Sequence, residues 1–148
     1  MNIQDLAQIV DEAAKNATAI EQLSKSQTFN EEESYAIQAA SIERRYARGE
    51  QFVGLKMGFT SYAKMEQMGI HDMIWGRLTD DMLYQNGDTI PFSKFIHPRA
   101  EPEICFMVKK AIDHTLTLDE MPTYISGVAA AIEIIDSRYQ NFKFSLED

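Results

Sequence analysis

Two glutamates, one residue apart, begin the apolar stretch 99–108 and constrain how this part of the chain folds. The stretch has the composition of a β-strand, in which side chains alternate between faces, so Glu101 and Glu103 point the same way. Two carboxylates on one face repel each other and are costly to bury unless a positive charge lies between them. A hard divalent cation, which prefers oxygen ligands, would supply that charge. The alternative, which the motif alone favours, is a pair of solvated acids at a strand entrance.

A third acid, Glu133, stands between isoleucines in the segment 127–139, whose centre has the composition of a buried strand. An ionised acid in such a strand needs a basic partner or a metal. Three carboxylates from two strands, with positions left for water and substrate, would make a Mg²⁺ or Mn²⁺ site. The alternative is that Glu133 pairs with Lys56 or with an arginine, and the pattern does not decide between the two.

Lys56 is unusual because it lies between Leu55 and Met57 in the apolar segment 51–60, which is predicted to be a strand. Its simplest placement lays the aliphatic stem along apolar surface and keeps the ammonium in water. If the ammonium is held near a metal, it would stabilise a developing enolate or transfer a proton. Lys56 is therefore a candidate catalytic residue.

The order of elements, helices first and strands later, predicts the α+β class. Helical periodicity predicts a first helix from Ile3 to about Asn16, and Asn30 with Glu33 forms a capping box for a second helix that ends at Gly49. We expect a helical region, residues 1–50, and the first part of a β-rich catalytic domain, residues 51–148.

Shorter elements complete the second region: a helix over 62–68 that stops at Gly69, a strand over 74–78 and a short helix around 118–121. Two further expectations concern side-chain exposure. Cys105 is predicted to be a small buried hydrophobe. Arginines 44, 45 and 48 are predicted to form a solvated face.

Composition excludes several classes of partner and location. The chain has 148 residues, enough for one core, and 14 basic against 23 acidic residues give it a net charge of -9. This charge argues against nucleic acid and anionic membrane surfaces. A single cysteine permits no intrachain disulfide, and the N-terminus shows neither a signal peptide nor a membrane span. We expect a cytoplasmic protein.

Three motifs, residues 54–69, 98–106 and 133–144, occur in an order that resembles one enzyme family. This is the family of 4-oxalocrotonate decarboxylases and 2-hydroxypenta-2,4-dienoate (2-keto-4-pentenoate) hydratases, within the fumarylacetoacetate hydrolase superfamily. The resemblance implies a divalent metal, usually Mg²⁺, held by Glu101, Glu103 and Glu133, with Lys56 as the active-site lysine. It also implies a small 2-oxo dicarboxylic acid substrate that chelates the metal, which acts as a Lewis acid on the enolate.

The residue before the pair Trp75–Gly76 distinguishes the two activities in this resemblance, because hydratases carry an acid there and this chain has Ile74. An isoleucine cannot transfer the proton that hydration needs. The expected reaction is decarboxylation of 2-oxohex-3-enedioate (4-oxalocrotonate) to 2-hydroxypenta-2,4-dienoate and CO₂ in aromatic meta-cleavage catabolism, with hydration as the alternative. The resemblance further implies a homo-oligomer and a complex with the partner hydratase.

Members of the family continue well past the position of Asp148. We therefore expect a fumarylacetoacetate-hydrolase-like mixed β-roll that is incomplete in this chain. A second alternative follows: the chain is a catalytically inactive fragment that serves as an assembly module, with an exposed apolar patch as its mark.

Overall fold

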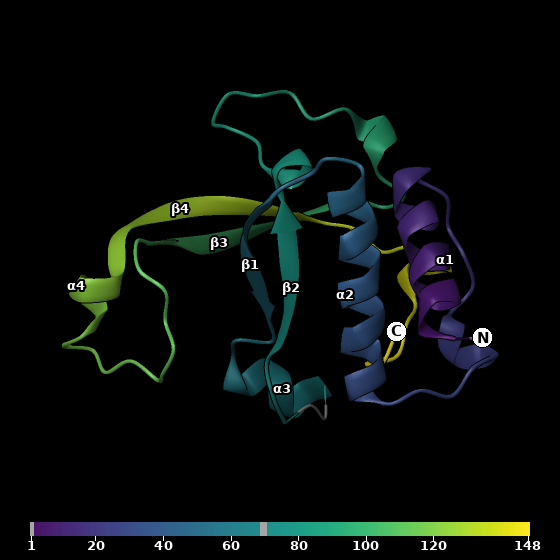
Figure 1. Ribbon diagram of the computed structural model, residues 1–148, viewed down its shortest axis with the longest axis horizontal. Coiled ribbons are helices and arrows are strands. Elements are labelled where there is room, and N and C mark those ends of the chain that lie inside the picture. The colour runs from purple at the N-terminus through teal and green to yellow at the C-terminus, as the bar shows by residue number, and fades with distance from the viewer. Residues whose placement is uncertain (1, 69–70) are drawn as a thin grey trace. The chain divides into compact units, whose positions relative to one another are not determined.

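Two structural units make up the chain in the computed structural model, which describes residues 2–68 and 71–148 (Figure 1). The first unit comprises Met1–Ile96 with Ser137–Asp148, and the second comprises His97–Asp136. Helices and antiparallel strands both occur, so the predicted α+β class is confirmed. The division at residue 50 stays a prediction.

The two predicted long helices are α1 (Ile3–Lys15) and α2 (Glu31–Ala47), and they pack against each other in the first unit. Each begins with a capping box, in which an asparagine side chain accepts from the third helical residue and that residue's carboxylate accepts in return. Gly49, at φ +100°, follows the end of α2 in the left-handed conformation that glycine adopts freely. The buried core of the unit consists of Leu6, Ala7, Val10, Leu23, Ile37, Ala40 and Tyr139.

The segment after residue 136 contacts α1 and contributes Tyr139 to this core. Ile20 and Tyr139 form a parallel bridge, in which the Ile20 amide donates to the Arg138 carbonyl at 2.8 Å. The Arg138 guanidinium donates to the Val10 carbonyl at 3.0 Å. Burial, reinforced by the charge of Asp148, raises the pKa of Tyr139 to about 12, so this phenol remains neutral.

A two-stranded antiparallel sheet, β1 (Phe52–Gly58) with β2 (Ile74–Thr79), completes the main part of the first unit. The helix α3 (Tyr62–Met68) connects the strands, and the predicted stop at Gly69 lies outside the described residues. Trp75 stacks on Tyr35 of α2 with ring centroids 5.0 Å apart, so one face of the sheet packs on that helix. Lys56 is on the other face, because side chains alternate along β1.

The second unit is an antiparallel ribbon of β3 (Arg99–Val108) and β4 (Ile125–Ile135), joined through the short helix α4 (Met121–Tyr124). The helix predicted around 118–121 therefore begins later, at Met121. Four 3₁₀ turns complete the described residues: Leu23–Lys25, Asp80–Met82, Phe92–Lys94 and Gln140–Phe142.

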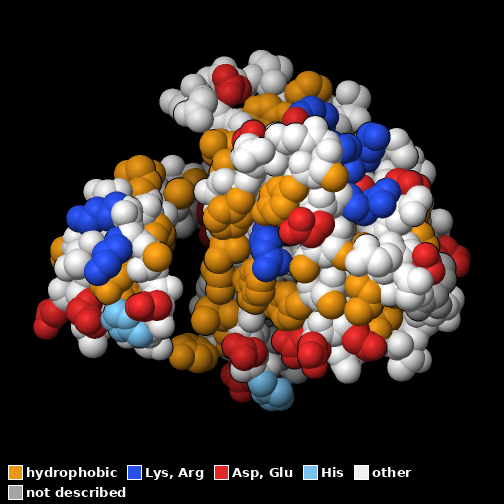
Figure 2. All heavy atoms as spheres, viewed as in Figure 1, with side chains coloured by type: hydrophobic (Ala, Val, Ile, Leu, Met, Phe, Trp, Pro, Cys, Tyr) orange, Lys and Arg blue, Asp and Glu red, His pale blue; other side chains and the backbone are white. Residues whose placement is uncertain are grey.

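Two predictions about burial are wrong, and the ribbon explains both. Cys105 is exposed, and the supposedly buried centre of β4 is largely exposed, with Ile132 at 72%. An apolar strand is buried only if another element covers the faces of its sheet, and composition alone does not reveal such a cover. Large hydrophobic side chains remain exposed in both units (Figure 2). In the described parts of the chain, no helix combines the length and apolar character needed to span a bilayer.

The prediction of a solvated arginine face is only partly confirmed: Arg48 is exposed, but Arg44 and Arg45 are half-buried and all three arginines form ion pairs. Arg48 donates to both carboxylate oxygens of Asp11 at 2.7 and 2.8 Å, and Arg44 donates to the same carboxylate at 3.0 Å. Arg45 pairs with Glu50 at 3.1 Å. The arginines therefore tie α2 to α1 and to the segment that leads into β1.

Candidate metal centre

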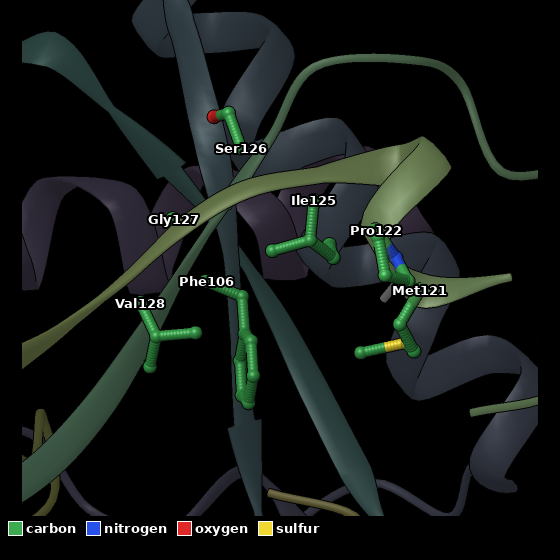
Figure 3. A pocket seen from close by; sticks show the side chains of 7 residues that line it. All are labelled: Phe106, Met121, Pro122, Ile125, Ser126, Gly127 and Val128. Atoms are coloured by element: carbon green, nitrogen blue, oxygen red, sulfur yellow. The ribbon is translucent and has the colours of Figure 1, made fainter. Parts of the chain in front are cut away.

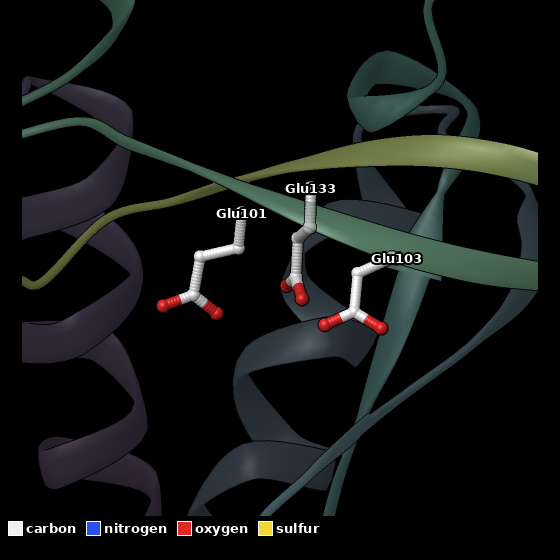
Figure 4. A group of neighbouring side chains, drawn as sticks. All are labelled: Glu101, Glu103 and Glu133. Atoms are coloured by element: carbon white, nitrogen blue, oxygen red, sulfur yellow. The ribbon is translucent and has the colours of Figure 1, made fainter.

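Three glutamates meet on one face of the β3–β4 ribbon. Glu101 lies directly opposite Glu133 in the ladder, and Glu103, two residues further along β3, lies opposite Ala131. Opposed residues of an antiparallel pair share a face, and so do residues two apart on one strand. All three side chains accordingly point to the same side of the ribbon (Figure 4). One carboxylate oxygen from each glutamate lies within 4.8 Å of the other two.

The donor set suits a hard divalent cation. Three carboxylates bring three negative charges together, which repel one another without a counter-charge. Octahedral Mg²⁺ with bonds of about 2.1 Å holds its ligand oxygens roughly 3–4 Å apart, so small rotations would bring these oxygens into one coordination sphere. Glu101 and Glu103 are exposed and Glu133 is half-buried, which leaves one side open to water or a ligand.

Small side chains lie next to the carboxylates on the same face. Ala131 is opposite Glu103, and Ala129 is opposite Cys105 at the next position along. None of these side chains reaches as far from the ribbon as a glutamate does. The face therefore has room beside the carboxylates for water and for a small ligand.

The structure brings the three predicted metal ligands together, which is the arrangement that the sequence pattern required. Lys56 belongs to the first unit, where it is half-buried in β1 and lies opposite Gly76. Its catalytic role and the metal-binding role of the glutamates stay predictions.

A shallow apolar hollow of about 270 Å³ occurs near the α4 end of the ribbon (Figure 3). No carboxylate or basic group lines it, so it offers neither metal ligands nor an acid–base pair. It is not the candidate site. Its lining consists of Phe106, Met121, Pro122, Ile125, Ser126, Gly127 and Val128.

Comparison with known proteins places the chain in a family. No protein-family model matches it. A protein of a Pseudomonas species named 4-oxalocrotonate decarboxylase is 48% identical over 148 residues, which are all of this chain and 58% of that protein. A 2-hydroxypent-2,4-dienoate hydratase of Pseudomonas putida is 39% identical over 119 residues, 79% of this chain and 54% of that protein. The chain belongs to the decarboxylase–hydratase family.

A solved structure of the family supports the same placement. It is the 4-oxalocrotonate decarboxylase from Pseudomonas putida G7, complexed with magnesium and adipate. It matches with a TM-score of 0.91 at 35% identity, over 98% of this chain and 56% of that chain. The present chain therefore spans little more than half the length of these three relatives.

Proposed function

We propose that this chain provides the metal-binding part of a decarboxylase that converts 2-oxohex-3-enedioate (4-oxalocrotonate) to 2-hydroxypenta-2,4-dienoate and CO₂ in aromatic meta-cleavage catabolism. The observation that carries the proposal is the convergence of Glu101, Glu103 and Glu133 on one face of the ribbon. The identity of 48%, over all 148 residues of this chain, to a protein named 4-oxalocrotonate decarboxylase supports the choice of reaction.

The three glutamates would hold Mg²⁺, with Mn²⁺ as a chemically similar substitute, and a relative of the same fold is complexed with magnesium. When bound, the cation supplies Lewis acidity to the carboxylate and keto oxygens of a 2-oxo acid. The open side of the carboxylate cluster gives a small dicarboxylic acid access to that position. The adipate in the related structure supports this substrate class.

Lys56 would stabilise the negative charge that the reaction creates. When the bond between C5 and C6 breaks, C6 leaves as CO₂, and the electron pair moves through the conjugated chain to the C2 oxygen. An ammonium donating to that oxygen lowers the energy of the dienolate, and a proton then completes the 2-hydroxydienoate. Lys56 is the residue proposed for this task.

Hydration, as by a 2-keto-4-pentenoate (2-hydroxypentadienoate) hydratase, is the alternative, supported by the 39% identity to a protein named 2-hydroxypent-2,4-dienoate hydratase. The β1–β2 register supports decarboxylation, because Ile74 pairs with Gly58 on the Lys56 face and supplies no proton there. Incubating the chain with Mg²⁺ and, in separate samples, with 4-oxalocrotonate and with 2-hydroxypenta-2,4-dienoate, followed by detection of CO₂ and of organic products, tests the choice. Formation of a 4-hydroxy-2-oxo acid from the dienoate, with no CO₂ from 4-oxalocrotonate, would reject the decarboxylase.

A non-catalytic assembly module is the remaining possibility, and the exposed apolar side chains of the ribbon support it. Ile104 is 66% exposed and Ile132 72%, on the face opposite the glutamates. Such surface also supports association into a homo-oligomer, or with the partner hydratase, in the cytoplasm. Metal binding without consumption of either substrate would favour the module over both enzymes.

A further inference from the structure

The side chain of Lys56 lies across a glycine of the neighbouring strand. Gly76 is directly opposite Lys56 in the β1–β2 ladder. A Cβ atom added to Gly76 would lie 3.3 Å from Cγ, 3.7 Å from Cδ and 3.8 Å from Cε of the lysine. The aliphatic stem therefore lies against the position that a Cβ at residue 76 would take and leaves slightly too little room for it.

We propose that Gly76 is a positioning residue for Lys56. Because Gly76 has no side chain, the aliphatic stem of the lysine lies against the backbone at residue 76, and this contact fixes the direction in which the ammonium points. The catalytic consequence rests on the role proposed for Lys56, whereas the placement of the stem does not. Lysine has four rotatable side-chain bonds, and a stem held against backbone loses much of that freedom. Gly76 thereby restricts where the ammonium can go.

The other glycines on this face show that the contact is specific to Gly76. A Cβ on Gly54, two residues before Lys56, would meet nothing within 4 Å. A Cβ on Gly58 would lie 2.8 Å from Cγ1 of Ile74, the residue opposite it. Ile74 therefore lies over Gly58 as Lys56 lies over Gly76, and these two long side chains share the face as diagonal neighbours.

An alanine at position 76 would displace the lysine. A carbon contact of 3.3 Å is tighter than van der Waals separation, so the stem has to move by a few tenths of an ångström or change rotamer. The movement grows toward the end of a long side chain. A displacement of about 1 Å at a reacting group can cost roughly 100-fold in rate, so even a small change at position 76 has a measurable effect.

Nuclear Overhauser contacts in the 148-residue chain test the placement without any activity. We expect cross-peaks between the Gly76 α-protons and the Lys56 γ- and δ-methylene protons in the wild type. Gly76→Ala should shift the Lys56 side-chain resonances and alter their contacts with β2, while the matched variant Gly54→Ala should leave them unchanged. Absence of the wild-type cross-peaks in a folded sample overturns the proposal, and so does an equal response to both variants.

Kinetics separate this proposal from the function on which its consequence rests. With CO₂ release as the assay, Gly76→Ala should lower kcat by roughly tenfold to 100-fold with little change in KM, and Gly54→Ala should change neither. If Lys56→Met retains full activity, the proposed role of Lys56 fails, while the cross-peaks still decide the placement. If Lys56→Met is inactive and Gly76→Ala has the wild-type kcat, positioning by Gly76 is overturned.

Discussion

Glu101 and Glu133 lie directly opposite each other in the β3–β4 ladder, although they are 32 residues apart in the sequence. Like charges in opposed positions of an antiparallel pair destabilise it. Glu103 adds a third carboxylate on the same face. A divalent cation bound between the three carboxylates would attract each of them and so outweigh their mutual repulsion.

Removal of one carboxylate should weaken metal binding. Glu103→Gln keeps the size of the side chain but removes its charge. Loss of a residue that only orients a metal ligand weakens metal binding roughly 10- to 100-fold, so we expect loss of a ligand charge to lower the Mg²⁺ affinity by at least that factor. Isothermal titration with Mg²⁺ or Mn²⁺ measures it. Asp119→Asn is the matched control, because it removes an exposed acid of the same unit that is not in the cluster. Equal affinities for the two variants would contradict the assignment.

The effect of Glu101→Gln on stability should change sign with metal. In EDTA the variant relieves repulsion with Glu133, so the free energy of unfolding should rise by about 0.2–1 kcal/mol. In excess Mg²⁺ the wild type gains binding energy that the variant largely loses, and the order should reverse. Thermal unfolding in both buffers measures the two differences. A variant that is less stable in both would show that the carboxylate has another structural role.

Local pattern sufficed for part of the site. Alternation along a strand is a local property, so it placed Glu101 and Glu103 on one face without knowledge of the fold. A separate argument, from the apolar composition around it, marked Glu133 as an acid in need of a counter-charge. The register that pairs Glu101 with Glu133 depends on how two distant segments align, and alternation alone leaves that register open.

The errors came from contacts that are distant in sequence. Asp11 binds Arg44 and Arg48, which are 33 and 37 residues away, and only the packing of α1 on α2 brings them together. One local signal was present, because Asp11 interrupts an otherwise apolar helix face next to Val10. Cys105 was mispredicted because strand composition does not reveal whether a sheet face is covered.

Loss of the buried Asp11 charge should destabilise the first unit. Burial alone would raise the pKa of Asp11, but hydrogen bonds from Arg48 and Arg44, with their charges, outweigh it and lower the pKa below its ordinary value. Asp11→Asn should therefore cost about 3 kcal/mol of unfolding free energy, near the lower limit for buried pairs because both arginines are partly exposed. Denaturant unfolding at neutral pH measures the loss, and Glu43→Gln, a surface change on α2, is the control.

The lowered pKa of Asp11 also predicts how the stability of the chain changes at acidic pH. Because the folded-state pKa of Asp11 is lowered, its stabilising contribution is fully present above the ordinary carboxyl pKa of about 4 and is lost as the pH falls below it. Unfolding free energies measured from pH 6 down to pH 2 should fall less steeply for Asp11→Asn than for the wild type. Parallel curves would show that Asp11 titrates alike in the folded and unfolded chain.

Ile74 should determine which product the site forms. Ile74 and Lys56 are diagonal neighbours on one face of the β1–β2 sheet, about 7–8 Å apart, so an acid at position 74 would be within reach of the lysine. Positioned acid–base groups contribute roughly 10²–10⁴-fold to proton transfer. We expect Ile74→Asp to form 4-hydroxy-2-oxo acid from the 2-hydroxydienoate at least tenfold faster than Ile74→Asn, which has the same shape without the acid. Product analysis by chromatography measures both rates. Equal rates would mean that the residue before Trp75 does not separate decarboxylases from hydratases, and the preference for decarboxylation would then rest on overall identity alone.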